Sequence, residues 1–231
     1  MGQPDARMTD CSVLRDIDVV CFDVFGTLVE ITDRRRPFAH LKRKMTPEKV
    51  ARFRRMAMTT KMNLSEIDAE IQGGATVADF VVAQAAINRE VVSIRLRDSV
   101  AEILAGLPIR YGVCSNLSVD YVNTLKMFPE IKPAFRILSC FVGCMKPDPL
   151  IYELVIRAAG VPASRLLFVG DTPAADIEGP RSAGMRAIHI DRFMSALASG
   201  RTGRTRKDDF NAAFRDARGT ISPDLDLDLE S

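Results

Sequence analysis

Long hydrophobic runs are missing from this sequence. The 231 residues are 47% hydrophobic, which suffices for a buried core, but no segment approaches the roughly 18 consecutive apolar residues that a membrane-spanning helix needs. Residues 1–16 are polar and lack the apolar region of a secretory signal. We therefore expect a cytoplasmic protein without a membrane partner.

Cysteine and histidine are also scarce. The five cysteines are an odd number, and Cys140 and Cys144 have no second pair with which to complete a zinc site. We therefore expect reduced, structural thiols. The two histidines, His40 and His189, have no matching partner near the polar motifs described below, so we expect them at the surface or in packing.

Negative charge is nearly absent from one stretch, although the net charge of the chain is only +2. Between residues 34 and 61 there are eleven lysines and arginines and a single glutamate. Such a run is typical of a solvated helical face, and the presence of only two interleaved phenylalanines argues against a nucleic-acid partner. We expect a positive surface for a small anionic substrate, with Arg54 or Arg55 pointing toward it.

Short apolar runs of strand type alternate along the chain with segments of helix length. This alternation predicts an α/β fold with a doubly wound parallel sheet, similar to the Rossmann fold. The predicted strands lie near Val19–Asp23, Arg110–Cys114, Arg136–Ser139, Leu166–Val169 and Arg186–Ile190.

The connection between the first two predicted strands, residues 28–109, is far longer than one crossover helix requires. Within it, residues 47–62 and 77–92 have the pattern of amphipathic helices, and Gly73-Gly74 predicts the turn between them. We therefore expect an inserted α-helical cap domain. The predicted domains are a core over residues 1–30 and 98–231 and a cap over residues 31–97.

Helix start signals follow two of the later strands. Asp148 is a predicted N-cap with Pro149 at the first helical position, and Thr172-Pro173 offers the same start. Helix N-termini near strand ends favour bound anions, because their first N–H groups are unpaired. The first of these helices is expected to end at Gly160. Its predicted apolar stripe consists of Leu150, Ile151, Leu154 and Val155.

The signals weaken beyond Asp191. Residues 199–207 contain glycines and basic residues and predict a mobile loop. Residues 223–230 predict a frayed tail, and a final edge strand over residues 220–222 is the alternative.

Polar side chains recur where the predicted strands end. Asp23 follows the first apolar run and opens a loop that contains Phe25, Gly26 and Thr27. Because the carboxyl ends of parallel strands meet at one edge of a sheet, polar residues at these ends are expected to share one site. The others are Ser115, Asn116, Lys146, Asp171 and Asp176.

The predicted site is too acidic to hold an anionic substrate by itself. Asp23, Asp171 and Asp176 carry a formal charge of −3 and Lys146 returns +1, which leaves −2, a charge that would repel a phosphate dianion. A hard divalent cation bound by oxygen atoms brings the sum to zero and would stabilise the charge that develops in phosphoryl transfer. We therefore expect Mg²⁺ as the cofactor.

The order and spacing of these motifs resemble the four signatures of the haloacid dehalogenase superfamily. The likeness extends from Val19 to Ile190, and the helical insertion lies where the first cap type of that superfamily is found. The resemblance implies that Asp23 is a covalent nucleophile, that Ser115 binds the transferring group and that Lys146 orients nucleophile and substrate. The expected substrate-binding set is Thr27, Asn116, Arg54 and Arg55, and the expected Mg²⁺ set is Asp23, Phe25, Asp171 and Asp176.

The sequence departs from the pattern of this superfamily at Phe25. Phosphatases of the superfamily carry a second Asp two residues after the nucleophile, which protonates the leaving alkoxide and then activates water. Losing such a group typically lowers the rate by about 10²- to 10⁴-fold, so either the leaving group needs little protonation or a cap residue supplies the proton. Asp176 also has two possible roles, because it either binds the metal or only pairs with Lys146.

Three functions are compatible with these residues. The first is Mg²⁺-dependent hydrolysis of a small phosphorylated substrate through an aspartyl-phosphate, because Gly170–Asp176 resembles the metal-binding form of the fourth motif. The second is 2-haloacid dehalogenation through an ester of Asp23, since Phe25 and Tyr152 resemble that branch. The third is binding of a phosphorylated ligand or a partner without turnover, which Phe25 and the helix kink expected at Pro180 keep open. The sequence selects no oligomeric state.

Overall fold

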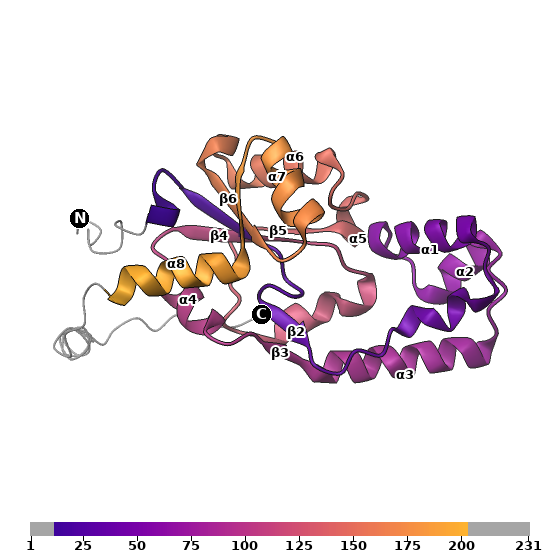
Figure 1. Cartoon of the computed structure of the whole chain (residues 1–231). Helices are drawn as coiled ribbons and strands as arrows, with labels where there is room; N and C mark the ends of the chain where they lie inside the picture. The colour runs from indigo at the N-terminus through magenta and orange to yellow at the C-terminus, as the bar shows by residue number, and fades with distance from the viewer. Residues whose placement is uncertain (1–11, 203–231) are drawn as a thin grey trace, which may run out of the picture.

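The computed structural model describes residues 12–202 (Figure 1). Its five-stranded parallel sheet has the order β5-β4-β1-β6-β7, so β1 lies in the middle. Phe22 of β1 is in register with Val113 of β4 and with Val169 of β6. The doubly wound α/β fold predicted from the sequence is thereby confirmed. The strands are β1 (Val19–Phe22), β4 (Arg110–Ser115), β5 (Arg136–Leu138), β6 (Leu166–Gly170) and β7 (Arg186–His189).

Both faces of the sheet are buried, which explains why its strands are nearly continuous apolar runs. On one face, Val20 and Phe22 share a hydrophobic cluster with Phe193 of α8, whose ring centroid lies 5.6 Å from that of Phe22. On the other face, Cys21 shares a cluster with Val155 of α6. The helices are α4 (Val100–Gly106) and α8 (Ile190–Thr202) on the first face, and α6 (Pro149–Ala159) and α7 (Gly179–Ser182) on the second.

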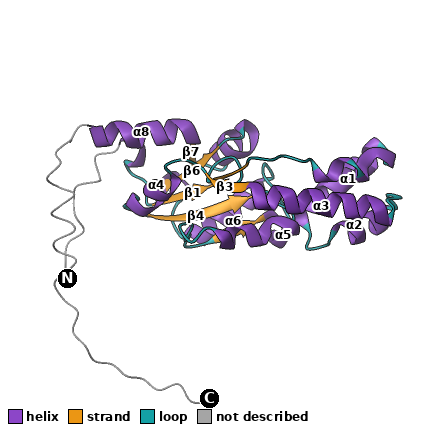
Figure 2. Ribbon diagram, turned by 90° about the horizontal axis from the view of Figure 1, so that it is seen from below, coloured by secondary structure: helices purple, strands orange, loops and turns teal. Residues whose placement is uncertain are grey.

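A second, two-stranded sheet lies where the chain enters and leaves the helical insertion. β2 (Val29–Ile31) and β3 (Ile94–Leu96) are antiparallel, with Glu30 opposite Arg95. Each strand has three residues, too few to show the alternation by which strands are identified in a sequence. The insertion extends from the end of the main sheet to which the arrow of β4 points (Figure 2).

The insertion contains three α-helices, whereas the sequence pattern predicts two. The unpredicted α2 begins with a capping box, in which Oδ1 of Asn63 accepts the N–H of Glu66 at 3.0 Å and Oε2 of Glu66 accepts the N–H of Asn63 at 2.7 Å. The turn predicted at Gly73-Gly74 therefore lies between α2 and α3. The helices are α1 (Pro47–Thr59), α2 (Leu64–Ile71) and α3 (Val77–Ser93), preceded by the 3₁₀ helices η2 (Pro37–Ala39) and η3 (Leu41–Lys44).

The predicted bounds of α6 are confirmed, but its buried face differs from the prediction. Oδ1 of Asp148 accepts the N–H of Leu150 at 3.0 Å, and the helix is capped by Gly160, whose φ of 64° suits glycine. Leu150 is 50% exposed, although the pattern places it in the apolar stripe, and Tyr152 is buried instead. The buried residues are Ile151, Tyr152, Val155 and Ala159.

The helix that begins at Pro173 is wound more widely than predicted. Its first turns form the π-helix η6 (Pro173–Glu178), in which the N–H of Gly179 bonds to the carbonyl of Ala174, and α7 follows with Pro180 in its first turn. The disruption expected at Pro180 therefore takes the form of a change in winding just before it. The other short helices are η1 (Ser12–Leu14), η4 (Val119–Met127), α5 (Ser139–Val142) and η5 (Ala163–Arg165).

Part of the loop predicted near the end of the chain is helical. Residues 199–202 belong to α8, so the prediction of a loop over residues 199–207 is wrong there. Packing of Phe193 against the sheet stabilises this helix despite its weak local signal. The rest of that loop, the alternative strand over residues 220–222 and the tail over residues 223–230 lie outside the described residues.

Two features of the structure concern membrane spans and cysteines. Within residues 12–202, no helix combines the length and the hydropathy that a membrane span requires. The cysteines of this part are all buried and carry free thiols, as expected of structural cysteines. They are Cys21, Cys114, Cys140 and Cys144.

Candidate active site

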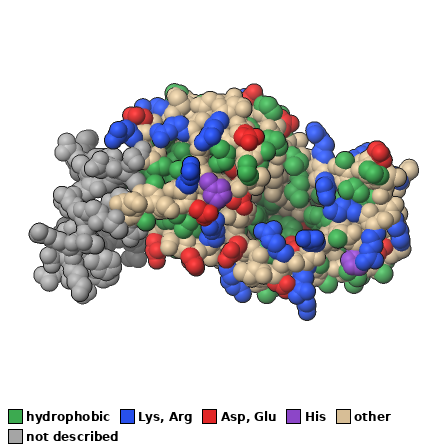
Figure 3. All heavy atoms as spheres, viewed as in Figure 1, with side chains coloured by type: hydrophobic (Ala, Val, Ile, Leu, Met, Phe, Trp, Pro, Cys, Tyr) green, Lys and Arg blue, Asp and Glu red, His purple; other side chains and the backbone are tan. Residues whose placement is uncertain are grey.

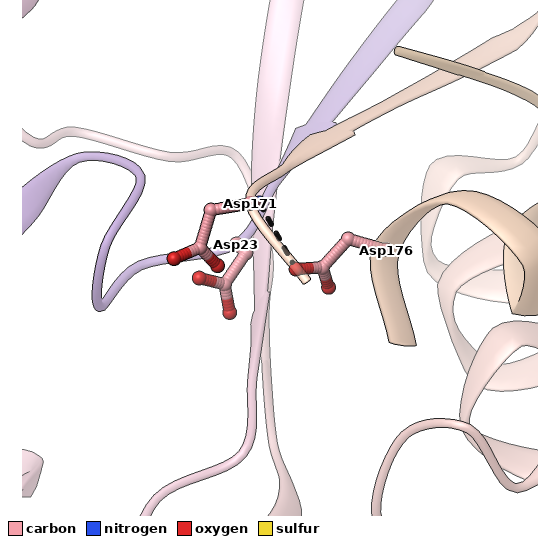
Figure 4. Close-up of side chains that lie close together, drawn as sticks. All are labelled: Asp23, Asp171 and Asp176. Carbon is pink, nitrogen blue, oxygen red and sulfur yellow. Dashed lines mark hydrogen bonds between the residues drawn. The ribbon is translucent and has the colours of Figure 1, made fainter. Parts of the chain in front are cut away.

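The carboxyl edge of the sheet carries a cluster of three carboxylates (Figure 4). Asp23 directly follows β1, Asp171 directly follows β6, and Asp176 lies in η6. One oxygen atom from each carboxylate lies within 4.8 Å of the others. Because β1 and β6 are neighbours in the sheet, the first two aspartates leave adjacent strand ends, and the winding of η6 brings the third beside them.

Lys146 lies between two of these carboxylates. Its Nζ donates to Oδ1 of Asp23 at 2.8 Å and to Oδ1 of Asp176 at 2.6 Å, and the lysine side chain is only 2% exposed. Asn116 holds the backbone of Lys146 by two reciprocal hydrogen bonds of 2.8 Å. The ammonium group is therefore fixed by residues from three parts of the chain.

Both oxygens of Asp176 are already engaged. While Oδ1 accepts from Lys146, Oδ2 accepts the N–H of Asp171 at 3.2 Å and the N–H of Thr172 at 2.9 Å. Gly170 lets this carboxylate approach, since a Cβ atom there would lie 2.4 Å from Cγ of Asp176. These contacts favour the role in which Asp176 positions Lys146 and the loop that carries Asp171.

Burial and mutual charge determine how these groups ionise. Burial raises the pKa of Asp23, the ammonium of Lys146 opposes this rise, and the charge of Asp176 adds to it. Burial alone would lower the pKa of Lys146, but the charges of Asp23 and Asp176 hold it well above its ordinary value. Lys146 therefore keeps its proton at neutral pH, and with the three aspartates ionised the formal charge of the four side chains is −2.

Two buried hydroxyl groups near the strand ends lack partners. Among the described residues, Oγ of Ser115 and Oγ1 of Thr27 are buried and form no hydrogen bond. Ser115 ends β4, next to the strand that precedes Asp23, and Thr27 lies in the loop after Asp23. An unsatisfied buried polar group costs about 1–3 kcal/mol, so each hydroxyl would gain from a hydrogen-bond partner.

Gly26 allows the loop after Asp23 to pack against Asp171. Its φ is +94°, and a Cβ atom there would lie 2.1 Å from Oδ2 of Asp171. The carbonyl of Gly26 accepts a 2.8 Å hydrogen bond from Arg97, which follows β3 and also forms a 2.7 Å ion pair with Asp191. The sequence gives no local signal for the roles of Arg97 and Asp191, because the two contacts of Arg97 join segments that are distant in the chain.

Phe25 occupies the position two residues after Asp23 and offers no side-chain oxygen. Its ring packs edge-to-face on that of Tyr121, with the centroids 5.9 Å apart, and the hydroxyl of Tyr121 donates to Glu90 of α3. Among the described residues, the side chains that could together hold a metal ion are those of the three aspartates. A contribution from Phe25, which the resemblance places in the metal set, would have to come from its backbone carbonyl.

Arg54 and Arg55 lie exposed on α1. In the described part of the chain, neither side chain forms an ion pair or a hydrogen bond, and no contact joins them to the aspartate cluster. The charge of Arg54 lies near Lys42, whose pKa is lowered first by burial and then by this arginine. Substrate binding by Arg54 and Arg55 stays a prediction.

A family model described as haloacid dehalogenase-like hydrolase matches residues 17–184. The chain belongs to this family. The resemblance of its motifs to the haloacid dehalogenase superfamily is thus confirmed, and the chain is a hydrolase by family. The subclass of cap stays a prediction.

Short parts of this hydrolase are similar to two phosphatases. A phosphoserine phosphatase from Thermus thermophilus is 41% identical over 56 residues, which are 24% of this chain and 22% of that protein. A glyceraldehyde 3-phosphate phosphatase from Pyrococcus abyssi is 38% identical over 52 residues, 22% of each protein. The chain thus aligns with less than a quarter of each relative's length.

Solved structures share the fold over most of the chain. A 2-haloacid dehalogenase from Pseudomonas syringae pv. Tomato has a TM-score of 0.52 and 21% identity, covering 84% of this chain and 90% of that one. A haloacid dehalogenase family enzyme from Bacteroides thetaiotaomicron, complexed with magnesium and inorganic phosphate, has a TM-score of 0.55 and 18% identity, covering 75% and 93%. At these identities the likeness shows the fold alone.

Proposed function

We propose that this hydrolase is a Mg²⁺-dependent phosphatase-type enzyme that acts on a small anionic substrate in the cytoplasm. The observation that carries the proposal is the buried contact of Asp23 with Lys146, beside the carboxylate of Asp171. This arrangement combines a nucleophile, a fixed cation and oxygen ligands for a metal. The partial matches to two phosphatases support the same reaction class.

Asp23 and Asp171 are the residues that would hold Mg²⁺. Their carboxylate oxygens are the hard donors that this ion prefers, and the formal charge of −2 in the cluster calls for a divalent cation. Asp176 fits better as the partner of Lys146, because both of its oxygens accept hydrogen bonds. When bound, the ion supplies Lewis-acid stabilisation of the charge on phosphoryl oxygens. The magnesium and phosphate in the Bacteroides enzyme support this choice.

Asp23 is the proposed nucleophile. A bond forms between its carboxylate oxygen and phosphorus while the bond from phosphorus to the leaving oxygen breaks, and water then hydrolyses the aspartyl-phosphate. Lys146, 2.8 Å from Asp23, orients the carboxylate and offsets the charge of the phosphoryl group. The unpartnered hydroxyl of Ser115 is available to a phosphoryl oxygen, and Asn116 keeps Lys146 in place.

Residues 31–97 form the proposed cap domain over a core of residues 1–30 and 98–231. The antiparallel pair of β2 and β3 at the two connections would act as its hinge. The cap would exclude water from the site and present cations such as Arg54 or Arg55 to the substrate. Thr27, buried in the loop beside the hinge, would keep the nucleophile loop in shape.

Dehalogenation of a 2-haloacid is the second candidate. An aromatic residue at Phe25 favours it, and a 2-haloacid dehalogenase is among the solved structures with this fold. The pairing of Asp23 with Asp171 argues against it, because an added carboxylate would repel the carboxylate of the haloacid. Binding of a phosphorylated ligand without turnover is the third candidate.

Phosphate release from 4-nitrophenyl phosphate tests the first candidate. We expect release that requires Mg²⁺ and stops on chelation, and that Asp23→Asn abolishes while Asp18→Asn preserves. Asp18 is a matched control, because it lies at the other end of β1 and pairs with Arg165 instead. Release that persists after chelation would contradict the proposal. Chloride release from 2-chloropropionate, unchanged by the chelator, would favour the dehalogenase.

A further inference from the structure

We infer that the substrate of this site is a phosphate ester or anhydride whose leaving oxygen is already acidic, namely an aryl, enol or acyl phosphate. The inference rests on the proposed function and narrows its substrate class. Its basis is that Phe25 is apolar and that the proton carriers Tyr121 and Lys146 are engaged in other contacts.

Phe25 and Tyr121 form an aromatic wall beside the loop that carries Asp23. Their ring planes meet at 82° with the centroids 5.9 Å apart. Breaking the ester bond of an alkyl phosphate releases an alkoxide, which needs a proton. Phe25 cannot supply that proton. Since a positioned acid contributes about 10²- to 10⁴-fold to such a step, the aromatic wall penalises alkyl esters.

The aromatic wall contains one polar group, the hydroxyl of Tyr121, and the proton of this hydroxyl already forms a hydrogen bond. It donates to Oε2 of Glu90 in a buried contact between the core and α3. Transfer of this proton would break a hydrogen bond to a buried carboxylate, so Tyr121 is poorly suited to protonate a leaving oxygen.

Glu90 is held as an acceptor on both oxygens. Besides the contact with Tyr121, its Oε1 accepts the N–H of Arg35 at 2.6 Å and the N–H of Arg36 at 3.0 Å. The residue is 5% exposed. Because every contact uses Glu90 as an acceptor, this carboxylate is not poised to protonate a substrate.

Three other proton carriers are engaged in contacts of their own. Lys146 is held between two carboxylates, and the hydroxyl of Tyr152 donates to the carbonyl of Ala175 at 2.6 Å. Nδ1 of His189 accepts the N–H of Asp191 at 3.3 Å at the end of β7. His189 is the nearest alternative by position, because it is in register with the residue before Asp171.

The surface between the sheet and the inserted helices agrees with an apolar leaving group. Figure 3 shows that the surface is hollowed between the sheet and the inserted helices and that hydrophobic side chains line the hollow. Lysine and arginine side chains lie at its rim, where they would meet an anion. Such a surface offers little to the hydroxyl groups of a polyol.

A series of phosphates with leaving groups of graded acidity tests the inference. The series runs from acyl phosphates, with a leaving-group pKa of about 4, through 4-nitrophenyl phosphate and then phenyl phosphate, with a leaving-group pKa of about 10, to alkyl phosphates of matched size. With Mg²⁺, we expect kcat/KM to fall at least about 100-fold from 4-nitrophenyl phosphate to the alkyl ester. Values within tenfold of each other would overturn the inference while leaving the proposed function intact.

Two substitutions at one position isolate the missing proton. Phe25→Asp should raise the ratio of alkyl to aryl turnover at least tenfold, whereas Phe25→Asn, which is polar but cannot transfer a proton, should not. An equal rise in both variants would overturn the inference, because polarity rather than acidity would then limit alkyl turnover. If both variants fail to fold, the leaving-group series of the unaltered protein still decides.

Three further results would also contradict the inference. A steeper dependence on leaving-group acidity in Tyr121→Phe, Glu90→Gln or His189→Asn would identify that residue as the donor. A shallow dependence that changes when Mn²⁺ replaces Mg²⁺ would assign the proton to metal-bound water. Phosphate release from no member of the series would overturn the proposed function, and the inference with it.

Discussion

The carboxyl edge of the sheet and the inserted helices hold their charged side chains in different ways. At the edge, Lys146 is 2% exposed and lies within 2.8 Å of two carboxylates. On α1, Arg54 and Arg55 are exposed, and the described residues offer their side chains no partner. The edge is therefore organised before substrate binds, whereas Arg54 and Arg55 would have to be ordered by a bound substrate.

This difference separates chemistry from selectivity. A charge fixed in a buried network acts at full strength on the reacting group, because it needs no reorganisation. A charge on an exposed, mobile side chain contributes little, since solvent and salt screen it. Substitutions at the sheet edge should therefore change kcat, and substitutions on the insertion should change KM.

The largest effect is expected at Lys146. Lys146→Met should lower kcat/KM about 10³-fold, because it removes a preorganised cation from the transferring group and leaves buried carboxylates unpaired. Steady-state assays with 4-nitrophenyl phosphate measure the loss. Lys126→Met, at an exposed lysine of η4, is the matched control and should retain full activity. Equal activity of both variants would show that the fixed ammonium group of Lys146 does not contribute to catalysis.

An intermediate effect is expected at Gly26. Gly26→Ala places a Cβ atom where Oδ2 of Asp171 now lies, 2.1 Å away, so the Mg²⁺ concentration for half-maximal activity should rise at least tenfold. Gly143→Ala is the control, because Gly143 has a similar φ of +78° but open space at Cβ. Both variants carry a backbone strain of about 1–2 kcal/mol. A similar metal requirement in both would show that strain, not contact with Asp171, is responsible.

A smaller effect is expected on the pH profile. Asp23 must be ionised to attack, so activity falls as the pH drops through its raised pKa. Because the charge of Asp176 contributes to that rise, Asp176→Asn should lower the pKa of Asp23 and move the acid limb of kcat/KM to lower pH. Glu178→Gln, an exposed residue of the same helix, should leave the limb in place. A shift to higher pH would have the wrong sign for this electrostatic coupling.

The smallest effect is expected on the insertion. Arg54→Ala and Arg55→Ala should raise KM by about two- to fivefold with little change in kcat, and added salt should mask the difference. Arg52→Ala is a control on the same helix, since Arg52 already pairs with Glu70 at 2.9 Å. A loss of kcat in either variant would show that this arginine acts in the chemical step, and would contradict the difference between the two regions.

The sequence predicts the sheet edge well because the relevant signals are local. Each of Asp23, Ser115 and Asp171 follows an apolar run that is long enough to identify a central strand. Parallel strands then bring these ends together without further information. The choice between the two possible roles of Asp176 is the part that needs the structure, because its contacts depend on the winding of η6.

The insertion is predicted less well because some of its elements are short and its contacts with the core join residues that are distant in the sequence. The three-residue strands β2 and β3 are too short to show a period, and the pattern does not predict the eight-residue α2 between the two expected helices. The bond from Tyr121 to Glu90 and the bond from Arg97 to Gly26 join residues 31 and 71 positions apart. No local pattern specifies such pairs.

Calorimetric titration with Mg²⁺ tests the central claim most directly, because the account depends on an acidic sheet edge that binds a divalent cation. We expect the unaltered protein and Asp18→Asn to bind Mg²⁺ with the same affinity, and Asp171→Asn to bind it at least tenfold more weakly. The absence of a binding signal in the unaltered protein, or an unchanged affinity in Asp171→Asn, would contradict the account.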